Sequence, residues 1–199
     1  MRQIVVFDRV SADGYYASTD GNLNWAVPEP ELDKGAAGSL DGADTMLFGR
    51  RTYNMFESFW PKALDNSTTA PDPHAPGRRN TEMHALAVWI NDTAKVVYSR
   101  TRTSVTWKNS RLAGEFDPRE VAAMKQQPGR NIMVFGSGSV VSLLAEHDLV
   151  DEYQLVVNPV LLGGGQTLVR GLSAARPVEL IEAATYASGN VKLRYRPRR

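Results

Sequence analysis

The sequence predicts an α/β domain in which a mainly parallel central sheet carries an antiparallel C-terminal hairpin and has helices on both faces. Short apolar runs rich in β-branched residues alternate with stretches of helical spacing, which is the pattern of parallel strands joined by helices. Two of these runs end at glycine and lead directly into a helical stretch. Near the C-terminus, apolar residues alternate with Lys and Arg from Val191 to Tyr195, as is typical of a half-exposed antiparallel strand.

Length and composition indicate one globular domain over residues 1–199. Hydrophobic residues make up 42% of the chain and charged residues 23%, which allows both a substantial core and a polar surface. The formal net charge is only +1, so we expect no nucleic-acid partner. The chain has no cysteine, which excludes disulfides and thiolate metal sites, and we expect no metal. The N-terminal apolar run is too short for a signal peptide or a membrane span, so we expect a cytoplasmic location and no membrane partner.

The first half of the chain is expected to form two strands and three helices. The strands are the apolar runs 4–7 and 45–48. Helices are expected from about Pro28, where acidic residues follow a proline, over residues 53–60, where aromatic residues have helical spacing, and over residues 81–89, which begin at a Thr cap. Residues 61–80 are polar and contain four prolines, so they are expected to form a surface loop, either a lid or an insertion.

The second half is expected to contain most of the remaining strands. Short strands are predicted at residues 96–98, 105–107, 132–135 and 153–157, and a final hairpin at 178–186 and 191–195. A helix should begin at the cap residue Asp117, bury Val121 and Met124, and end before Pro128. A further helix follows the strand 132–135, and its apolar face is predicted from i, i+3, i+4, i+7 spacing to consist of Val140, Leu143, Leu144 and His147.

Three predicted strands end in residues that suit an anion. The segments are Gly49-Arg50-Arg51-Thr52, Ser99-Arg100-Thr101 and Gly136-Ser137-Gly138-Ser139. The carboxyl ends of parallel strands lie at one edge of a sheet, where ligands bind, so these segments should open on the same face. Helix N-termini and arginine both bind phosphate. The sequence therefore predicts a ligand with several phosphates, such as a nucleotide that carries a pyrophosphate and a separate 2′-phosphate.

Each of these segments also has a simpler interpretation. Glycine at a strand-to-helix turn often serves only to allow a positive φ, and arginines in a first helical turn are often merely exposed. Val141 stands where the dinucleotide-binding fingerprint has its third glycine, so we do not expect a Rossmann domain.

The order of motifs along nearly the whole chain resembles the dihydrofolate reductase superfamily. Within it, the chain is similar to the branch of the C-terminal reductase domain of the bifunctional riboflavin-biosynthesis deaminase/reductase. The motifs that carry the resemblance are FDRVSADGYYA, DGNLNW, MLFGRRTY, VVYSRT, IMVFGSGSVVSLL and LVDEYQLVVNPVLLGGG. The resemblance implies a dihydrofolate reductase-like three-layer fold, NADPH as hydride donor, a small-molecule substrate and a homodimer.

The resemblance also implies positions for the cofactor and the substrate. Phosphates would be held at the first helix after strand 45–48, the adenosine 2′-phosphate after strand 96–98, and the pyrophosphate after strand 132–135, with Phe135 beside the nicotinamide ribose. The implied cofactor-binding residues are Gly49, Arg50, Arg51, Thr52, Ser99, Arg100, Thr101, Phe135, Gly136, Ser137, Gly138, Ser139 and Val140. The implied substrate-binding residues are Ser11, Trp25, Glu29 and Asp33.

The chain departs from true dihydrofolate reductases at the acid that holds the pterin. That position on the first helix is Pro30, and its neighbours Glu29 and Glu31 point in other directions on a helix, which argues against folate reduction. Reduction also needs a proton donor, and Asp13 is the candidate catalytic residue because it lies just beyond the first strand. The alternative for Asp13 is ordinary Asp-Gly turn chemistry.

Three functions are consistent with these residues. The first is an NADPH-dependent reductase of a small heterocyclic, pterin- or pyrimidine-like, or carbonyl substrate. The second is a protein that binds NADPH without catalysis, as a sensor or partner module. The third is a stand-alone pyrimidine reductase of riboflavin synthesis.

Overall fold

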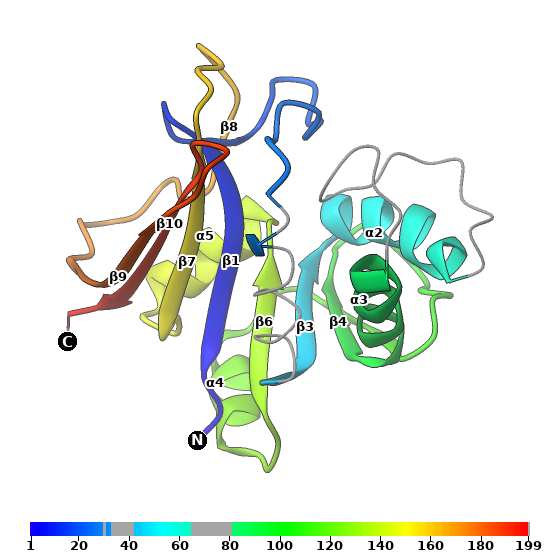
Figure 1. The fold of residues 1–199 in the computed structure, drawn as a ribbon. Coiled ribbons are helices and arrows are strands. Elements are labelled where there is room, and N and C mark those ends of the chain that lie inside the picture. Colours follow the sequence, from blue (N-terminus) through cyan, green and yellow to red (C-terminus); the bar gives the residue numbers. More distant parts are fainter. Residues whose placement is uncertain (30, 33–41, 65–80, 199) are drawn as a thin grey trace.

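The computed structural model describes residues 1–29, 31–32, 42–64 and 81–198, and the fold within them is built on one large sheet (Figure 1). Eight strands of the described chain form this sheet in the order β5-β4-β3-β6-β1-β7-β10-β9. Along that order their bounds are β5 Ser110–Gly114, β4 Ala94–Tyr98, β3 Ala43–Gly49, β6 Asn131–Phe135, β1 Ile4–Ser11, β7 Glu152–Asn158, β10 Val191–Pro197 and β9 Val178–Thr185.

The pairing confirms a mainly parallel sheet with an antiparallel C-terminal hairpin. Strand β1 pairs in parallel with β6 and β7, and β3 pairs in parallel with β4 and β6. Strand β10 runs antiparallel to both β7 and β9. The carboxyl ends of β4, β3, β6 and β1 therefore lie at one edge, as expected for the anion-suited segments.

Helices cover both faces of the sheet, in two separate apolar layers (Figure 1). Helices α2 (Arg50–Ala63) and α3 (Thr81–Asp92) pack on one face, and α4 (Pro118–Gln126) and α5 (Gly138–Glu146) pack on the other. Successive strand residues point to opposite faces, so Met46 and Phe48 join the α2 and α3 layer while Leu47 joins the α4 and α5 layer. This burial on both sides explains why the central strands are continuous apolar runs.

The capping prediction for α4 is confirmed. The Asp117 side chain accepts a 2.8 Å hydrogen bond from the backbone N–H of Arg119, and Pro118 occupies the first helical position. Val121 and Met124 are buried, as the spacing predicts. The cap fixes where the helix begins, and the inward apolar residues pack its face against the sheet.

The buried face of α5 differs from the predicted one. Val140, Val141, Leu144 and Ala145 point inward, whereas Leu143 is 40% exposed and His147 is the exposed C-terminal cap. The i, i+3, i+4, i+7 spacing predicts the helix and the burial of Val140 and Leu144 correctly, but it is wrong for Leu143 and His147. Residues 140, 141, 144 and 145 also form a continuous stripe on a helix, and this is the stripe that the sheet covers.

The strand predicted at residues 105–107 is wrong, because this segment lies in the connection before β5. Trp107 is buried there for another reason: its indole N–H donates a 2.8 Å hydrogen bond to Oδ1 of Asn91. Lys95 Nζ lies 4.3 Å from the centre of its ring, a cation–π contact. The aromatic residue anchors a loop rather than a strand.

Two further expectations fall partly outside the described residues. Residues 61–63 of the expected loop belong instead to helix α2, and residues 65–80 lie outside the described chain. Of the helix expected from about Pro28, residues 31–32 are helical, while residue 30 and residues 33–41, including Asp33, lie outside the described chain.

A small second sheet is absent from the sequence-based prediction. Strand β2 (Tyr15–Ala17) pairs antiparallel with β8 (Gln166–Thr167). Gly165 is required at this pairing, because a Cβ there would lie 2.3 Å from the carbonyl oxygen of Ala17. The two short strands bring the loop after β1 and the segment after β7 together above the carboxyl edge of the main sheet (Figure 1).

Candidate functional site

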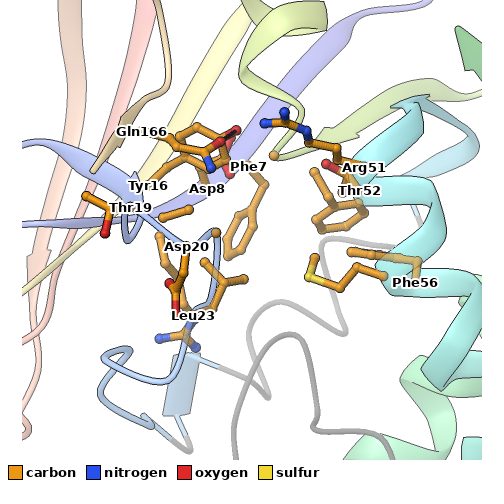
Figure 2. A pocket seen from close by; sticks show the side chains of 16 residues that line it. Phe7, Asp8, Tyr16, Thr19, Asp20, Leu23, Arg51, Thr52, Phe56 and Gln166 are labelled. Atoms are coloured by element: carbon orange, nitrogen blue, oxygen red, sulfur yellow. Dashed lines mark hydrogen bonds between the residues drawn. The ribbon is translucent and has the colours of Figure 1, made fainter. Parts of the chain in front are cut away.

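A pocket of about 490 Å³ lies at the carboxyl edge of the sheet (Figure 2). Its walls come from the ends of β1 and β6, the first turns of α2, and the β2–β8 sheet with the loop after β2. Four parts of the sequence, residues 7–23, 51–56, 135–136 and Gln166, therefore meet at the edge where parallel sheets hold ligands.

One wall of the pocket is aromatic. Phe7, Phe56 and Phe135 all line it, with ring centres 6.0 Å apart for Phe7 and Phe135 and 5.9 Å apart for Phe56 and Phe135. The Phe7 and Phe135 rings meet edge to face. Such a wall provides an apolar surface against which a flat heterocyclic ring can pack.

The N-terminus of α2 opens beside this wall. Gly49 is the N-cap, it supplies no capping side chain, and the first turn contains no acidic residue. Arg51 and Thr52 from this turn line the pocket, and Figure 2 shows both side chains at its rim. The positive end of the helix dipole and the arginine act together on any anion placed there.

The N-terminus of α5 is built in a comparable way. Gly136 and Ser137 have φ values of 53° and 61°, so two consecutive residues in the left-handed region turn the chain from β6 into the helix. The N-cap residue Ser137 makes no side-chain cap hydrogen bond, and the first turn has no acidic residue. The Gly138 N–H donates to Oη of Tyr16 across a long 3.4 Å contact. Gly136 lines the pocket, so both helix N-termini border it.

Asp8 is a buried acid at the centre of this arrangement (Figure 2). Its exposed fraction is 6%, and its carboxyl group accepts a hydrogen bond from the Gly136 N–H. Among the described residues, Oδ2 has no hydrogen-bond partner. Burial raises the pKa of Asp8 well above its ordinary value, and the Gly136 N–H offsets this only in part.

Tyr16 and Gln166 close the pocket above Asp8. The Tyr16 hydroxyl donates a 3.2 Å hydrogen bond to Oε1 of Gln166, which joins β2 to β8 through side chains as well as backbone. Burial raises the pKa of Tyr16, and the charge of Asp8 acts in the same direction, while Arg170 and Arg51 oppose it.

The structure brings four of the predicted cofactor residues into the pocket wall: Arg51, Thr52, Phe135 and Gly136. The others lie around it without lining it. Gly49 packs against the turn that opens α5, and a Cβ on it would lie 3.3 to 3.4 Å from Ser137, Ser139 and Val140. Arg50 is exposed on the first turn of α2.

The segment after β4 forms its own turn. The Ser99 hydroxyl accepts hydrogen bonds from the backbone N–H groups of Thr101, at 3.2 Å, and Arg102, at 2.9 Å. Arg100 and Thr101 are exposed, and none of the three predicted residues 99–101 lines the pocket. They stand at the next parallel strand end beyond β3.

The predicted catalytic residue and the predicted substrate residues that the structure describes do not line the pocket. The Asp13 carboxylate accepts hydrogen bonds from Ser11 Oγ, at 2.6 Å, and from the backbone N–H groups of Leu162 and Gly163. The Ser11 hydroxyl, and to a lesser extent these N–H groups, lower the pKa of Asp13, while desolvation opposes them. Asp13 and Ser11 thus hold the turn after β7 in place, and neither lines the pocket.

Trp25 and Glu29 form hydrogen bonds with residues that lie outside the pocket wall. The Trp25 indole N–H donates to the carbonyl oxygen of Asn22 at 3.2 Å. Glu29 is buried, and its Oε2 accepts a 2.5 Å hydrogen bond from Ser188 Oγ in the β9–β10 hairpin. Neither residue lines the pocket.

Sequence reasoning missed Asp8, Tyr16, Gln166 and Phe7 as pocket residues. Of these four residues, only Asp8 could have been suspected from the sequence. It is an acidic residue that directly follows the apolar run of β1 and continues the strand. In the described part of the chain, no group of three or more His, Asp or Glu side chains is placed to hold a metal ion. No helix among those described is long and apolar enough to cross a bilayer.

Fold and site together define an α/β protein with an aromatic-walled, anion-suited pocket at the carboxyl edge of its sheet. The chain belongs to the RibD C-terminal domain family, whose model matches residues 2–192. It is similar to the uncharacterized protein YyaP of Bacillus subtilis (strain 168), with 26% identity over 194 residues that cover 98% of this chain and 94% of the relative.

Solved structures confirm the fold class. A candidate riboflavin biosynthesis protein from Shewanella sp. PV-4 is similar over 99% of each chain, with a TM-score of 0.74 and 24% identity. A dihydrofolate reductase from Enterococcus faecalis, solved with NADP(H), is similar with a TM-score of 0.59 and 10% identity, over 98% of this chain and 96% of that one. The chain thus has a dihydrofolate reductase-like fold.

Proposed function

We propose that the protein is an NADPH-dependent reductase of a small heterocyclic, pterin- or pyrimidine-like, or carbonyl substrate. The observation that carries this proposal is the pocket itself, in which two helix N-termini and Arg51 adjoin an aromatic wall. The helix N-termini and Arg51 suit phosphates, and the aromatic wall suits a planar ring. Family membership and the NADP(H) complex of the similar dihydrofolate reductase support the same assignment.

The residues present fit a phosphorylated dinucleotide. Arg51 and Thr52 supply a cation and a hydroxyl, and the first turns of α2 and α5 supply backbone donors without competing acidic side chains. Gly136 leaves no side chain between the turn and the pocket. Arg100, with Ser99 and Thr101, stands at the adjoining strand end and would contact a 2′-phosphate, favouring NADPH over NADH. When bound, NADPH supplies a hydride, while the protein positions the reactants and excludes water.

The proposal is tested by following NADPH absorbance with a panel of pterins, aminopyrimidines and small carbonyl compounds. Steady, substrate-dependent NADPH oxidation is the expected result. Tight NADPH binding without oxidation of any acceptor would instead favour the second candidate, a non-catalytic NADPH-binding sensor or partner module.

A stand-alone pyrimidine reductase of riboflavin synthesis is a more specific form of the same proposal. It is favoured by the match to the RibD C-terminal domain family and by the similarity to the Shewanella protein. Complementation of a riboflavin auxotroph that lacks the reductase step tests it. Growth without added riboflavin is the expected result, and failure to grow despite good expression would point to a different heterocycle.

We also propose that the protein forms a homodimer. Strand β9 is an edge of the large sheet and exposes apolar side chains, with Leu180 at 52%, Ile181 at 45% and Val178 at 41% exposure. Exposed apolar edge strands are usually covered in native proteins. Light scattering after size exclusion should give twice the chain mass, and Leu180→Lys should give the monomer mass.

A further inference from the structure

We propose that Asp8 is the acid that delivers the proton to the reduced substrate. The inference rests on the proposed reductase function and names a residue for a step that this function requires. It differs from the sequence-based candidate, because Asp13 is occupied by the turn after β7 and does not line the pocket.

Asp8 lies toward the carboxyl end of β1, among the residues that line the pocket. It follows Phe7 of the aromatic wall, and Figure 2 draws Asp8 in the same part of the pocket as Tyr16 and Gln166. Gly136 faces Oδ1, since a Cβ on that glycine would lie 3.5 Å from this oxygen. The other oxygen, Oδ2, is buried and has no partner among the described residues. A buried polar atom is normally hydrogen-bonded, so an unpaired carboxyl oxygen on a residue that lines the pocket suits a group that arrives with the ligand.

The surroundings of Asp8 favour the neutral acid, which is the form that can donate a proton. The side chain is 6% exposed, and burial raises its pKa well above the ordinary value. The Gly136 N–H is the single lowering influence identified on it. The charged or titratable groups that line the same pocket are Arg9 on β1, Tyr16 on β2, Asp20 in the loop after β2 and Arg51 on α2.

The proton transfer balances the reduction. The substrate accepts a hydride, with two electrons, at the carbon of a C=N or C=O group, and the reduced nicotinamide is oxidised to NADP⁺. The π electron pair of the substrate moves onto its nitrogen or oxygen, the O–H bond of Asp8 breaks, and a new N–H or O–H bond forms on the substrate. Asp8 is left as a carboxylate and regains its proton from water before the next turnover.

The test uses Asp8→Asn, with Asp92→Asn as the matched control. Asparagine keeps the size of the side chain and the acceptor for Gly136 N–H but cannot donate an acidic proton. Asp92 is an exposed residue at the end of α3, paired with Lys108 on the surface. For Asp8→Asn we expect kcat to fall at least about 100-fold, with NADPH affinity unchanged within roughly threefold. Asp92→Asn should match the wild type in both.

The pH profile separates proton donation from positioning. Wild-type kcat should fall as the pH rises through the pKa of Asp8, because only the protonated form is active, whereas the residual rate of Asp8→Asn should lack this limb. A kcat of Asp8→Asn equal to wild type would overturn the inference. So would a parallel loss of NADPH affinity, which would make Asp8 a binding group.

Infrared spectroscopy of the protein without ligand provides a readout independent of turnover. At a pH just above the ordinary range of exposed carboxyl groups, the wild type and Asp92→Asn should show the carbonyl band of a protonated carboxylic acid, and Asp8→Asn should lack it. Absence of the band from the wild type would overturn the inference even if the protein is a reductase. If the band is present but no substrate is reduced, the proposed function fails and the protonation of Asp8 stands.

Discussion

The backbone N–H of Gly49 donates a 2.8 Å hydrogen bond to Oγ of Ser137. Gly49 ends β3 and caps α2, while Ser137 lies between β6 and α5 in the left-handed region. The contact thus ties together the two helix N-termini that border the pocket. Both positions belong to the anion-suited strand ends, so one side chain sets the spacing of two proposed phosphate contacts.

Replacing Ser137 by alanine should destabilise the protein by about 1–3 kcal/mol, because the buried N–H of Gly49 loses its acceptor. Chemical unfolding in urea measures this free energy directly. The matched control is Ser139→Ala on the same turn, where the side chain is exposed and the change should be within about 0.5 kcal/mol. Equal effects of the two substitutions would show that the Gly49 contact contributes no stability.

Gly138→Ala should destabilise the protein by about 1–3 kcal/mol, although alanine is the better helix former. The new Cβ would lie 3.0 Å from the carbonyl oxygen of Thr167 and from a ring carbon of Tyr16, and 3.1 Å from the carbonyl oxygen of Leu168. The β2–β8 sheet would have to move away from α5, which should also weaken NADPH binding.

The control for this change is Gly164→Ala. A Cβ on Gly164 would meet open space, with its nearest contact 3.9 Å away at the methyl group of Thr19, so the unfolding midpoint should stay close to wild type. A gain of stability in Gly138→Ala would mean that the segment after β7 does not pack on the start of α5 in solution.

Arg51→Gln should weaken NADPH binding roughly tenfold to a hundredfold, because a hydrogen bond to a charged group contributes about 1.5–3 kcal/mol. Calorimetry on the folded variant gives the dissociation constant. Arg119→Gln is the control, since Arg119 lies on α4 and its side chain is 94% exposed. Unchanged affinity in Arg51→Gln would remove this residue from the cofactor site.

The pH dependence of stability should reveal the raised pKa of Asp8. In the unfolded chain Asp8 ionises near 3.8, whereas in the folded protein it holds its proton to a higher pH. Between these two pKa values the folded state binds more protons, so Asp8 makes stability fall as the pH rises through this window. Asp8→Asn does not titrate. Its stability relative to wild type should therefore increase as the pH rises from about 4 toward neutrality, and a difference independent of pH would contradict the pKa shift.

The fold and the strand-end motifs could be predicted because their signals are local. Gly49 and Gly136 each follow an apolar run and precede a helix, and the alternation of strands and helices indicates a parallel sheet. Asp8 and Asp13 could not be assigned correctly from local sequence, because their partners are distant along the chain. The sequence favours Asp13 because it stands near a strand end, but its partners Leu162 and Gly163 come from the segment after β7. Asp8 is buried beside Gly136, which lies far along the chain, so the sequence does not reveal its environment.

The β5 strand shows a second limit of prediction from the sequence. Residues 105–107 have the composition of a strand, and Trp107 is buried, yet its hydrogen bond to Asn91 places it in a loop. The strand that completes the sheet edge, Ser110–Gly114, is only partly buried and carries Ser, Arg and Gly. Edge strands are less apolar than central ones, so the apolar signal pointed to the wrong segment.

The most direct test of the account is a titration of the wild-type protein with NADPH and, separately, with NADH, followed by calorimetry or tryptophan fluorescence. We expect an NADPH dissociation constant of about 10 μM or lower, equivalent to about −7 kcal/mol, and NADH weaker by roughly tenfold or more. If neither nucleotide binds, the strand-end segments are only helix starts, and the proposed reductase function is contradicted.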